Sequence, residues 1–353
     1  MFKLNYKLFD LLKKNYYKTN QNDRPSKWWA RKISRLEKDI QNKDFSNFRG
    51  INTGINTSFS DSEIIDVRNI LGEKQKIIFN IFNQSFIAKN FNQQINLTNK
   101  YLSLFLCASQ NYYLHNDKVL KLTKNYDLSN TTGFGCISKI KINNLEVSFL
   151  ALEMINKINE IRGLSNLEKS KTYCEIGGGF GLNAQLILNN FKNIKKFLYI
   201  DTYPTIFYGT EYLRNYFNNN VIDYSETIEM NEIKFSNDDK LQIFCIPSWE
   251  MKKLNVEIDH FHNTFSFVEM SENIVINYLN YLKKFKTKSQ SLIFYPHSNT
   301  SAVDPIKLED IKKLYKSLNY CNFKQYKLQK LLNLNLRPGT KDDDLIIIDQ
   351  EGA

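Results

Sequence analysis

The sequence predicts an α/β protein with a doubly wound, mostly parallel sheet of seven strands and a helical N-terminal region. Two observations lead to this prediction. After residue 170, short apolar runs alternate with amphipathic stretches long enough for helices, which is typical of a parallel sheet with helices on both faces. The first run leads directly into a glycine-rich turn, EIGGGFG (175–181), as expected where a strand passes into a helix.

The N-terminal part of the chain shows mostly helical periodicity. The stretch PSKWWARKISRLEKDI (25–40) places four apolar side chains at helical spacing. We expect further helices at 61–93, 95–115 and 146–162, with a short strand near 137–142. Because 353 residues are about twice a typical domain, we divide the chain near residue 150. Residues 1–150 are expected to cap the substrate site or to mediate oligomerisation, and residues 151–353 to form the sheet domain.

The strands of the sheet domain are predicted from its short apolar runs. In chain order these are TYCEI (172–176), FLYID (197–201), LQIFCI (241–246), IDHFHNT (258–264), SLIFYP (291–296) and DLIIID (344–349). Most are separated by stretches that suit helical crossovers. We expect the last strand to form an antiparallel edge hairpin with YKLQKLLNL (326–334), across the turn RPGTKDDD (337–344).

Charge and cysteine content narrow the class of protein. The net charge is +11 but the basic residues are dispersed, so we expect no nucleic-acid partner, and at most a weak attraction to anionic membranes or acidic saccharides. The five cysteines form no CxxC pair, which argues against a disulfide framework or a zinc site and for a reducing cytoplasm. We expect no secretory signal and no integral membrane segment, because no apolar run is long enough.

The glycine turn predicts a site for a nucleotide-like ligand. Glycine permits positive φ and close approach of the backbone to a ligand, and the helix that follows presents free N–H groups at its positive end. The spacing G-x-G-x-x-G of dinucleotide-binding proteins is absent, because Leu182 stands at its last position. The pattern is instead E-x-G-x-G-x-G, and the next predicted strand ends at Asp201.

These residues resemble motif I of the class I S-adenosylmethionine (SAM) methyltransferases, which have a Rossmann-like fold. The resemblance implies SAM as cofactor, with the glycine turn against its methionine and ribose and Asp201 on the ribose hydroxyls. It also implies that the loop after the third strand borders the adenine. The implied cofactor contacts are Glu175, Gly177, Gly179, Phe180, Gly181, Asp201, Thr202, Ser248 and Trp249. Two alternatives stay open: Asp201 as the N-cap of the next helix and Trp249 as ordinary core.

A narrower resemblance covers about residues 171–300. The stretches DTYPTIFYGTEYLRNYF (201–217) and IDHFHNTFSFVEMSENIVINYL (258–279) are similar to a bacterial family of sugar O-methyltransferases from surface-polysaccharide gene clusters. Tyr203 departs from the family pattern by adding a residue between Asp201 and Pro204. The resemblance implies methyl transfer to a hydroxyl of a saccharide or of a nucleotide-linked or lipid-linked sugar.

A sugar hydroxyl is a poor nucleophile at neutral pH, so methyl transfer to it calls for a general base. Candidates near the ends of the fourth and fifth strands are Glu269, His297 and His262. Glu269 also suits a helix N-terminus, and His260 and His262 suit packing beneath a helix equally well. Polar contacts to the substrate are expected from Asn263, Ser266 and Tyr295. No compact set of ligands predicts a metal.

Two other functions remain compatible with the sequence. One is a methyltransferase acting on another small metabolite, a peptide or RNA, and an RNA enzyme would bind with a steep dependence on salt. The other is a non-catalytic binding protein that keeps the fold. The sequence leaves the oligomeric state open and is compatible with a homo-oligomer.

Overall fold

The computed structural model describes residues 4–19, 33, 34, 36–38, 40, 114–136, 139–294, 306–318, 320, 322–328, 331 and 343–349. The chain divides into two compact units. The larger comprises residues 1–42, 157–328 and 341–353, and the smaller comprises residues 43–156 and 329–340. The larger unit thus includes the first 42 residues, which the division near residue 150 assigns to the N-terminal region. That this region caps a substrate site or mediates oligomerisation stays a prediction.

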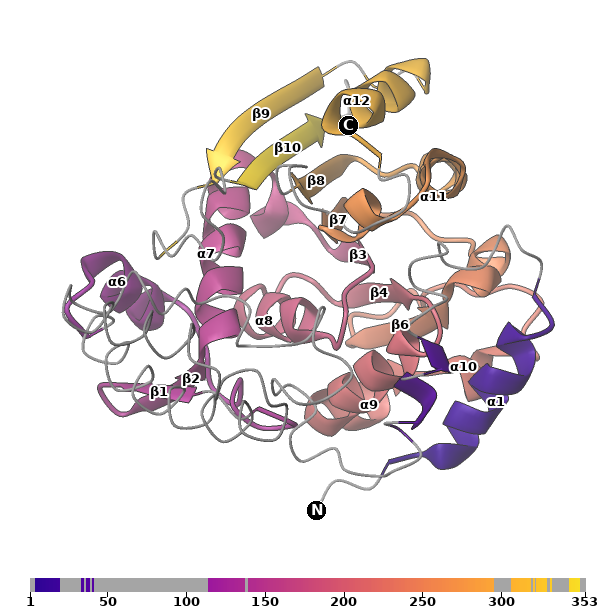
Figure 1. Ribbon diagram of the computed structural model, residues 1–353, viewed down its shortest axis with the longest axis horizontal. Helices are drawn as coiled ribbons and strands as arrows, with labels where there is room; N and C mark the ends of the chain where they lie inside the picture. The colour runs from indigo at the N-terminus through magenta and orange to yellow at the C-terminus, as the bar shows by residue number, and fades with distance from the viewer. Residues whose placement is uncertain are drawn as a thin grey trace, which may run out of the picture. The chain divides into compact units, whose positions relative to one another are not determined.

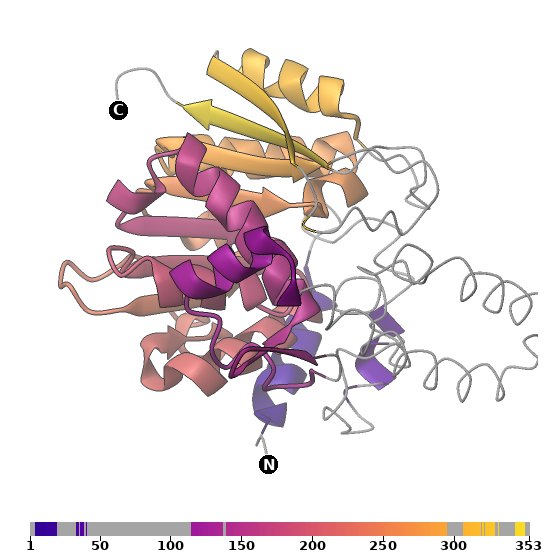
Figure 2. The same ribbon diagram turned by 90° about the vertical axis from the view of Figure 1, so that its left-hand side faces the viewer.

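The larger unit is built on one eight-stranded sheet with the order β5-β6-β4-β3-β7-β8-β10-β9 (Figure 1). The first six strands of this order are mutually parallel, whereas β10 pairs antiparallel with both β8 and β9. The antiparallel pair, yellow in Figure 2, lies at one edge of the sheet. The predicted doubly wound, mostly parallel sheet is therefore confirmed. It has one strand more than predicted, because the two-residue β5 (Val221–Ile222) adds to the other edge.

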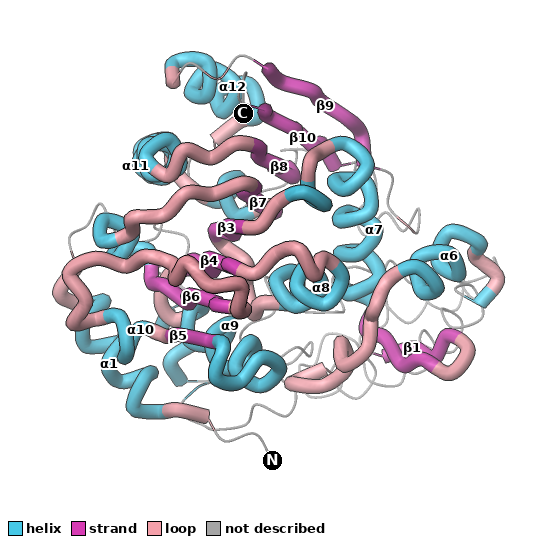
Figure 3. The backbone as a smooth tube through the Cα atoms, turned by 180° about the vertical axis from the view of Figure 1, so that it is seen from behind, coloured by secondary structure: helices cyan, strands magenta, loops and turns pink. Residues whose placement is uncertain are grey.

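The strands overlap the apolar runs that predict them, but β9 begins four residues before the run predicted at 326–334 and shares only residues 326–328 with it. They are β3 (Thr172–Ile176), β4 (Lys196–Asp201), β6 (Gln242–Pro247), β7 (His260–Thr264), β8 (Ser289–Phe294), β9 (Asn322–Leu328) and β10 (Asp343–Asp349). Figure 3 shows these strands in succession from behind. The order reverses direction between β3 and β7. Ligands of open α/β sheets bind beside such a switch point, at the carboxyl ends of the strands, and we call this edge of the sheet, at the ends of β3, β4 and β7, the crevice.

Helices connect the parallel strands and cover the sheet. The α-helices of the larger unit are α1 (Tyr6–Tyr16), the second half of α7 (Phe149–Leu164), α8 (Leu182–Asn190), α9 (Thr205–Phe217), α10 (Tyr224–Thr227), α11 (Glu272–Lys284) and α12 (Leu308–Ser317). Short 3-10 turns follow two of the strands: η5 (Ser248–Lys253) after β6 and η6 (Ser266–Glu269) after β7. The described helices include none that is long and apolar enough to cross a membrane.

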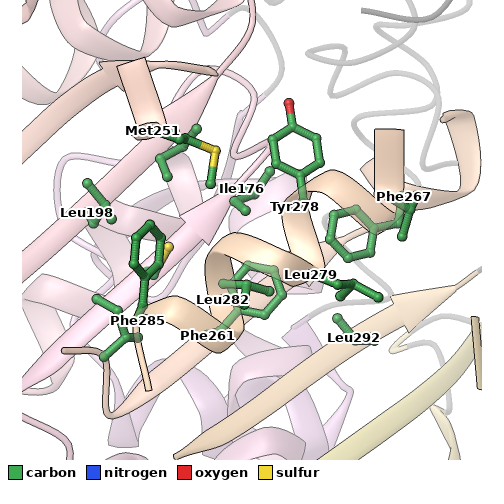
Figure 4. Close-up of a cluster of buried hydrophobic side chains, with 14 of the residues drawn as sticks. Ile176, Leu198, Met251, Phe261, Phe267, Tyr278, Leu279, Leu282, Phe285 and Leu292 are labelled. Atoms are coloured by element: carbon green, nitrogen blue, oxygen red, sulfur yellow. The ribbon is translucent and has the colours of Figure 1, made fainter. Parts of the chain in front are cut away.

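The two faces of the sheet differ in chemistry. On one face, alternate residues of β3, β4, β7 and β8 are apolar and pack with α11 and α12 into a buried cluster. Figure 4 shows part of this cluster, with Ile176, Phe261 and Leu292 from the sheet meeting Leu279 and Leu282 of α11. Burial of each such side chain stabilises the fold by roughly 1.5–3 kcal/mol.

The opposite face carries polar and aromatic side chains. Strand register places Glu175 beside Tyr199 on one side and His262 on the other, and partners in a parallel pair project to the same face. Helix α8 covers this face at Glu175, since its Asn183 amide donates a hydrogen bond to that carboxylate. The sheet therefore has an apolar face, which packs into the hydrophobic core, and a polar face, whose side chains continue to the carboxyl ends of the strands.

The smaller unit contains a helix, α6 (Asp117–Asn125), and a β-hairpin in place of the start of a predicted helix. Strands β1 (Lys139–Ile142) and β2 (Leu145–Ser148) pair antiparallel across Asn143 and Asn144. Asn143 adopts a φ of 54°, which asparagine tolerates in tight two-residue hairpin turns. The helix predicted at 146–162 is thus wrong at its start, and α7 begins at Phe149. The helix predicted at 61–93 lies outside the described residues, as do residues 95–113 of the helix predicted at 95–115.

Helix α1 packs on the rest of the larger unit through aromatic side chains. Tyr16 stacks on Tyr203, with ring centroids 5.0 Å apart, and the Tyr203 hydroxyl donates to Glu37, with 2.8 Å between the oxygens. Glu37 also receives hydrogen bonds from Lys13 and Tyr17 of the α1 segment. Glu37 thereby connects the α1 segment to Tyr203, which lies in the loop that follows β4.

Two glycines in helices provide a matched test of this packing. Gly209 of α9 lies directly over the Tyr199 ring, so that a Cβ there would overlap the ring, whereas a Cβ at Gly163 of α7 would meet nothing within 4 Å. Alanine usually stabilises a helix over glycine by about 0.5–1 kcal/mol. We expect Gly163→Ala to raise the melting temperature. Gly209→Ala should lower it, because overpacking reduces the free energy of unfolding by about 1–3 kcal/mol. Calorimetry of both variants checks this, and a rise for Gly209→Ala would contradict it.

Candidate functional site

The glycine turn joins β3 to α8 through three residues of positive φ. Gly177, Gly179 and Gly181 have φ values of 75°, 65° and 97°, a region that other residues rarely adopt. The Gly177 amide donates to the Ile200 carbonyl of β4 over 2.8 Å, and Gly181 is the N-cap of α8. The turn thus needs glycine for its backbone and presents the start of α8 at the crevice.

Close packing excludes side chains from the floor of the turn. A Cβ at Gly177 would overlap Ser266 of η6. One at Gly178 would lie 2.6 Å from a Tyr199 ring carbon and 2.8 Å from the Glu175 carboxylate. Gly178 is absent from the predicted cofactor contacts, because it stands at a variable position of the pattern E-x-G-x-G-x-G. The run of three consecutive glycines was the available signal.

Asp201 ends β4 and grips the turn. Its Oδ2 accepts a hydrogen bond from the Gly179 amide over 3.0 Å, and its Oδ1 accepts one from the Thr202 amide over 2.7 Å. The N-cap of α9 is Pro204, so the alternative reading of Asp201 as that N-cap is wrong. Each carboxylate oxygen keeps further lone pairs, which suit a ligand diol.

Burial raises the pKa of Asp201 to about 7, although hydrogen bonds from the Thr202 and Gly179 amides oppose the shift. The negative charge of Glu269 raises it further. Glu269 is half-buried at the end of η6. Its electrostatic effect on Asp201 shows that two predicted site residues, which follow different strands, lie close to each other.

Glu175 lies beneath the turn and is 2% exposed. Its Oε1 accepts a hydrogen bond from the Asn183 amide over 2.9 Å, while in the described part of the chain Oε2 has no partner. Burial raises the pKa of Glu175 to about 8, against the opposing effect of the Asn183 hydrogen bond. Glu175 therefore supports the turn from below rather than meeting solvent directly.

Tyr199 is a second support that the sequence does not reveal. Its hydroxyl donates to the Gly179 carbonyl, and its ring lies between Gly178 and Gly209. Gly179 is thus held at its amide by Asp201 and at its carbonyl by Tyr199. The signal was weak, because Tyr199 stands in a buried strand where an aromatic residue suggests ordinary core.

Ser248 and Trp249 follow β6 in η5, beside the loop after Asp201. Both are mostly buried, with exposed fractions of 8% and 5%. The Trp249 indole donates to the Tyr224 hydroxyl over 3.4 Å, and its ring lies 6.0 Å from that of Tyr16. Trp249 is therefore enclosed by aromatic neighbours from α1 and α10, and contact with an adenine ring stays a prediction.

Three further predicted residues occupy the rim of the turn. Phe180 is buried edge-on against Tyr212, with ring centroids 5.0 Å apart. Ser266 is half-buried, and its hydroxyl donates to the Ile176 carbonyl at the end of β3 over 3.2 Å. The Thr202 hydroxyl has no hydrogen-bond partner among the described residues, although the atom is buried. A ligand bound beside Asp201 could form the hydrogen bond that this buried hydroxyl lacks.

Asn263 is placed in the interior. It is fully buried, and its amide nitrogen donates to the Ile176 carbonyl over 2.8 Å and to the Ser266 hydroxyl over 2.5 Å. Its carbonyl oxygen accepts from the Phe267 amide over 3.2 Å. This position suits Asn263 to fixing the loop after β7, and disfavours the predicted contact with substrate.

His262 also lies inside the sheet. It is 1% exposed, both ring nitrogens are hydrogen-bonded to hydroxyls, and burial lowers its pKa to about 3. A group so weakly basic and so enclosed is disfavoured as the general base. The other predicted residues of this group, His297 and Tyr295, lie outside the described residues. Of the predicted bases, Glu269 is half-buried at the end of η6 and close enough to Asp201 to raise the pKa of that carboxyl group, and its role as the base stays a prediction.

No group of three or more His, Cys, Asp or Glu side chains that could hold a metal ion occurs among the described residues. The crevice instead fits a cofactor with an adenosyl group and a positive charge. Three features converge at the carboxyl ends of β3 and β4: a turn whose floor has no room for a side chain, a carboxylate with unused lone pairs, and a hydroxyl without a hydrogen-bond partner among the described residues. The carboxylates of Glu175, Asp201 and Glu269 make this edge of the sheet negative when ionised.

Comparisons with known proteins find likeness in fold. No family model and no curated protein matches the chain. Among solved structures, PigF with SAH shows 10% identity and a TM-score of 0.38 over 57% of this chain and 57% of that one. Human N-acetylserotonin methyltransferase in complex with SAM shows 10% identity and a TM-score of 0.38 over 57% and 54%.

Magnesium protoporphyrin IX methyltransferase from Synechocystis PCC 6803 with bound SAH shows 9% identity and a TM-score of 0.37 over 57% of this chain and 84% of that one. This chain spans little more than half the length of the first two proteins. Proteins crystallised with SAM or SAH are thus among those that this fold is similar to. Likenesses of this size leave the activity to be argued from the site itself.

The raised pKa of Glu175 predicts a pH-dependent stability of the free protein. Glu175 ionises near pH 4.3 when unfolded but near pH 8 when folded, so the folded state holds one more proton between these values. Its stabilising contribution is complete below the unfolded pKa and declines as pH rises. Relative to Glu175→Gln, we expect the wild-type free energy of unfolding to fall by about 2–4 kcal/mol from pH 5 to pH 8.

Urea unfolding of both proteins across this range measures the difference. Glu257→Gln serves as the control, because Glu257 is exposed and paired with Lys286, and its unfolding curves should run parallel to those of the wild type. Parallel curves for Glu175→Gln as well would show that Glu175 is ionised in the folded protein.

Proposed function

We propose that this protein is a SAM-dependent methyltransferase that transfers a methyl group to a hydroxyl oxygen. The single observation that carries the proposal is a hydrogen bond between the loops that follow two strands: the Gly179 amide donates to the Asp201 carboxylate. It joins the glycine turn after β3 to the acid that ends β4, as the resemblance to class I methyltransferases implies. The site would take SAM with its ribose at Asp201 and its methionine end along the turn.

The acceptor that we propose is a sugar hydroxyl in a saccharide or an activated sugar. The resemblance of residues 201–217 and 258–279 to sugar O-methyltransferases supports this acceptor. Two half-buried polar residues that follow β7, Ser266 and Glu269, also suit a hydroxyl-rich ligand. A metabolite of another kind, or RNA, remains the alternative that the assays below distinguish.

The chemistry divides simply between cofactor and chain. SAM, when bound, supplies a methyl group already activated by its sulfonium. The protein must align the acceptor oxygen with that methyl, an effect that can contribute several kcal/mol to the barrier reduction. We assign to Glu269 the acceptance of the proton of the acceptor hydroxyl; its half-buried position at the end of η6 and its electrostatic effect on Asp201 support this role. Asp201 and the turn fix the cofactor against which the acceptor is aligned.

Cofactor binding is tested with a substitution in the turn. Gly179 has a φ of 65°, which a β-branched side chain resists, so Gly179→Val should abolish SAM binding by displacing the amide from Asp201. We expect the wild-type melting temperature to rise at saturating SAM and that of Gly179→Val to stay constant. Gly163→Ala is the control and should respond as the wild type does. Absence of heat and of stabilisation in the wild type would favour a non-catalytic protein.

Catalysis is tested with Glu269→Gln, assayed by mass spectrometry with SAM and a panel of UDP-, GDP- and dTDP-linked hexoses. We expect a product heavier by one CH2 group and a kcat lowered by about 10²–10⁴-fold, the usual contribution of a general base. SAM affinity should stay unchanged. Methylation of RNA but of no sugar, with affinity that falls steeply with salt, would overturn the sugar assignment.

A further inference from the structure

Four side chains of the polar sheet face form a continuous chain of hydrogen bonds. The His260 Nε2 lies 2.8 Å from the Ser291 hydroxyl, and the same hydroxyl lies 2.8 Å from the His262 Nδ1. The His262 Nε2 in turn lies 2.6 Å from the Thr264 hydroxyl. His260, His262 and Ser291 are at most 1% exposed, whereas Thr264 is half-buried at the carboxyl end of β7. This series of hydrogen bonds therefore runs from the interior of the sheet to the carboxyl end of β7.

The inner end of the chain sets its direction. Within the described residues, the His260 Nδ1 is buried and has no hydrogen-bond partner. A buried N–H without an acceptor is rarer in proteins than an under-satisfied acceptor, and on this ground we assign the lone pair to Nδ1 and the proton to Nε2. Burial keeps both imidazoles neutral, because it lowers the pKa of each to about 3.

Each donor then determines the next. His260 donates to the Ser291 oxygen, so the one hydroxyl hydrogen of Ser291 points to the His262 Nδ1. His262 must carry its own proton on Nε2, and it donates to the Thr264 oxygen. In the described part of the chain His262 is the one partner of the Thr264 hydroxyl, whose hydrogen remains available to a ligand.

Strand register brings Thr264 beside the glycine turn. Glu175 of β3 pairs with His262 of β7. Two residues further along each chain lie Gly177, the first residue of the turn, and Thr264. Thr264 projects to the same face of the sheet as His262. Its hydroxyl therefore lies at the carboxyl end of β7, beside the strand that leads into the turn along which the proposed function places the methionine part of the cofactor.

A cation lies close to the same strand end. Lys157 of α7 is near enough to His262 to contribute to its lowered pKa, after burial and the neighbouring His260. Its ammonium lies 4.1 Å from the ring centre of Phe265, next to Thr264, and 3.7 Å from Asp343. A directed hydroxyl hydrogen with a positive charge nearby favours an anionic ligand oxygen.

The geometry points to Thr264 as the residue that binds the carboxylate of the cofactor's aminoacyl end, with His262, Ser291 and His260 as positioning residues that aim its hydroxyl hydrogen. This inference rests on the proposed function, since it assumes that the glycine turn holds SAM. It assigns a role to the buried histidines, which proton transfer does not use.

Two ligands that differ by one group test the inference on the full chain. SAM and decarboxylated SAM are titrated calorimetrically into the wild type, Thr264→Val and Thr264→Ser. We expect Thr264→Val to bind SAM about 10- to 100-fold more weakly, the range of a hydrogen bond to a charged group, with decarboxylated SAM bound as by the wild type. Thr264→Ser keeps the hydroxyl and should restore SAM affinity to within about 3-fold of wild type.

Thr210→Val is the matched control, because Thr210 is buried and its hydroxyl bonds to a carbonyl of its own helix. It should leave both affinities unchanged. Equal losses of both ligands in Thr264→Val would show a merely structural role and overturn the inference, as would no loss at all. Failure of the wild type to bind either ligand would instead overturn the proposed cofactor, and with it the inference.

The hydrogen-bond direction has its own measurement. Nitrogen-15 NMR of histidine-labelled protein distinguishes the two neutral tautomers, and His260→Phe and His262→Asn assign the signals. We expect both buried histidines to carry the proton on Nε2 and to stay neutral at pH 5. Protons on Nδ1 would reverse the chain and make Thr264 an acceptor, which would overturn the inference.

Discussion

The hydrogen bond from the Gly179 amide to the Asp201 carboxylate is the constraint on which the site depends. It links the loops after two adjacent parallel strands, and it is made by a residue of positive φ, Gly179. The Gly179 carbonyl is fixed from the other side by Tyr199, whose ring needs the bare backbone of Gly178 and Gly209 to pass. A turn held at both its amide and its carbonyl is preorganised, so little ordering is left for a ligand to impose.

Preorganisation has an electrostatic consequence. Two carboxylates, Glu175 and Asp201, are buried at the carboxyl ends of β3 and β4, and burial raises the pKa of both. A cationic ligand would favour their ionised forms, since an opposite charge lowers the pKa of a carboxyl group. The free protein thus stores an unfavourable electrostatic arrangement at the place where we propose that a sulfonium cofactor binds. Such storage at a functional site is a common trade of stability for binding.

The two faces of the sheet divide the work of the fold. The apolar face, covered by α11 and α12, supplies a contiguous hydrophobic cluster. The other face carries a glutamate, two histidines and a serine in the sheet interior, where isolated polar groups would be costly. Hydrogen bonds offset that cost, and along β7 they extend to the half-buried Thr264.

Much of the fold could be predicted from local pattern. Strands β3, β4, β6, β7 and β8 each lie within a few residues of their apolar runs, and the helices between follow from the need to cross from one strand to the next. The edges were less predictable. Strand β5 has two residues, and β2 replaces the start of a predicted helix because the Asn143–Asn144 turn favours a hairpin. Single-residue turn geometry outweighs helical periodicity there.

The sequence by itself determined the glycine turn, the acid after β4 and the alternation that sets the sheet, because backbone freedom and apolar period are local properties. Only the tertiary structure decided that His262 and Asn263 are enclosed, that Tyr199 supports the turn and that Thr264 stands beside it. These depend on strand register and on which side chains meet across strands. Neighbours in space that are tens of residues apart in the chain leave no local pattern from which to predict them.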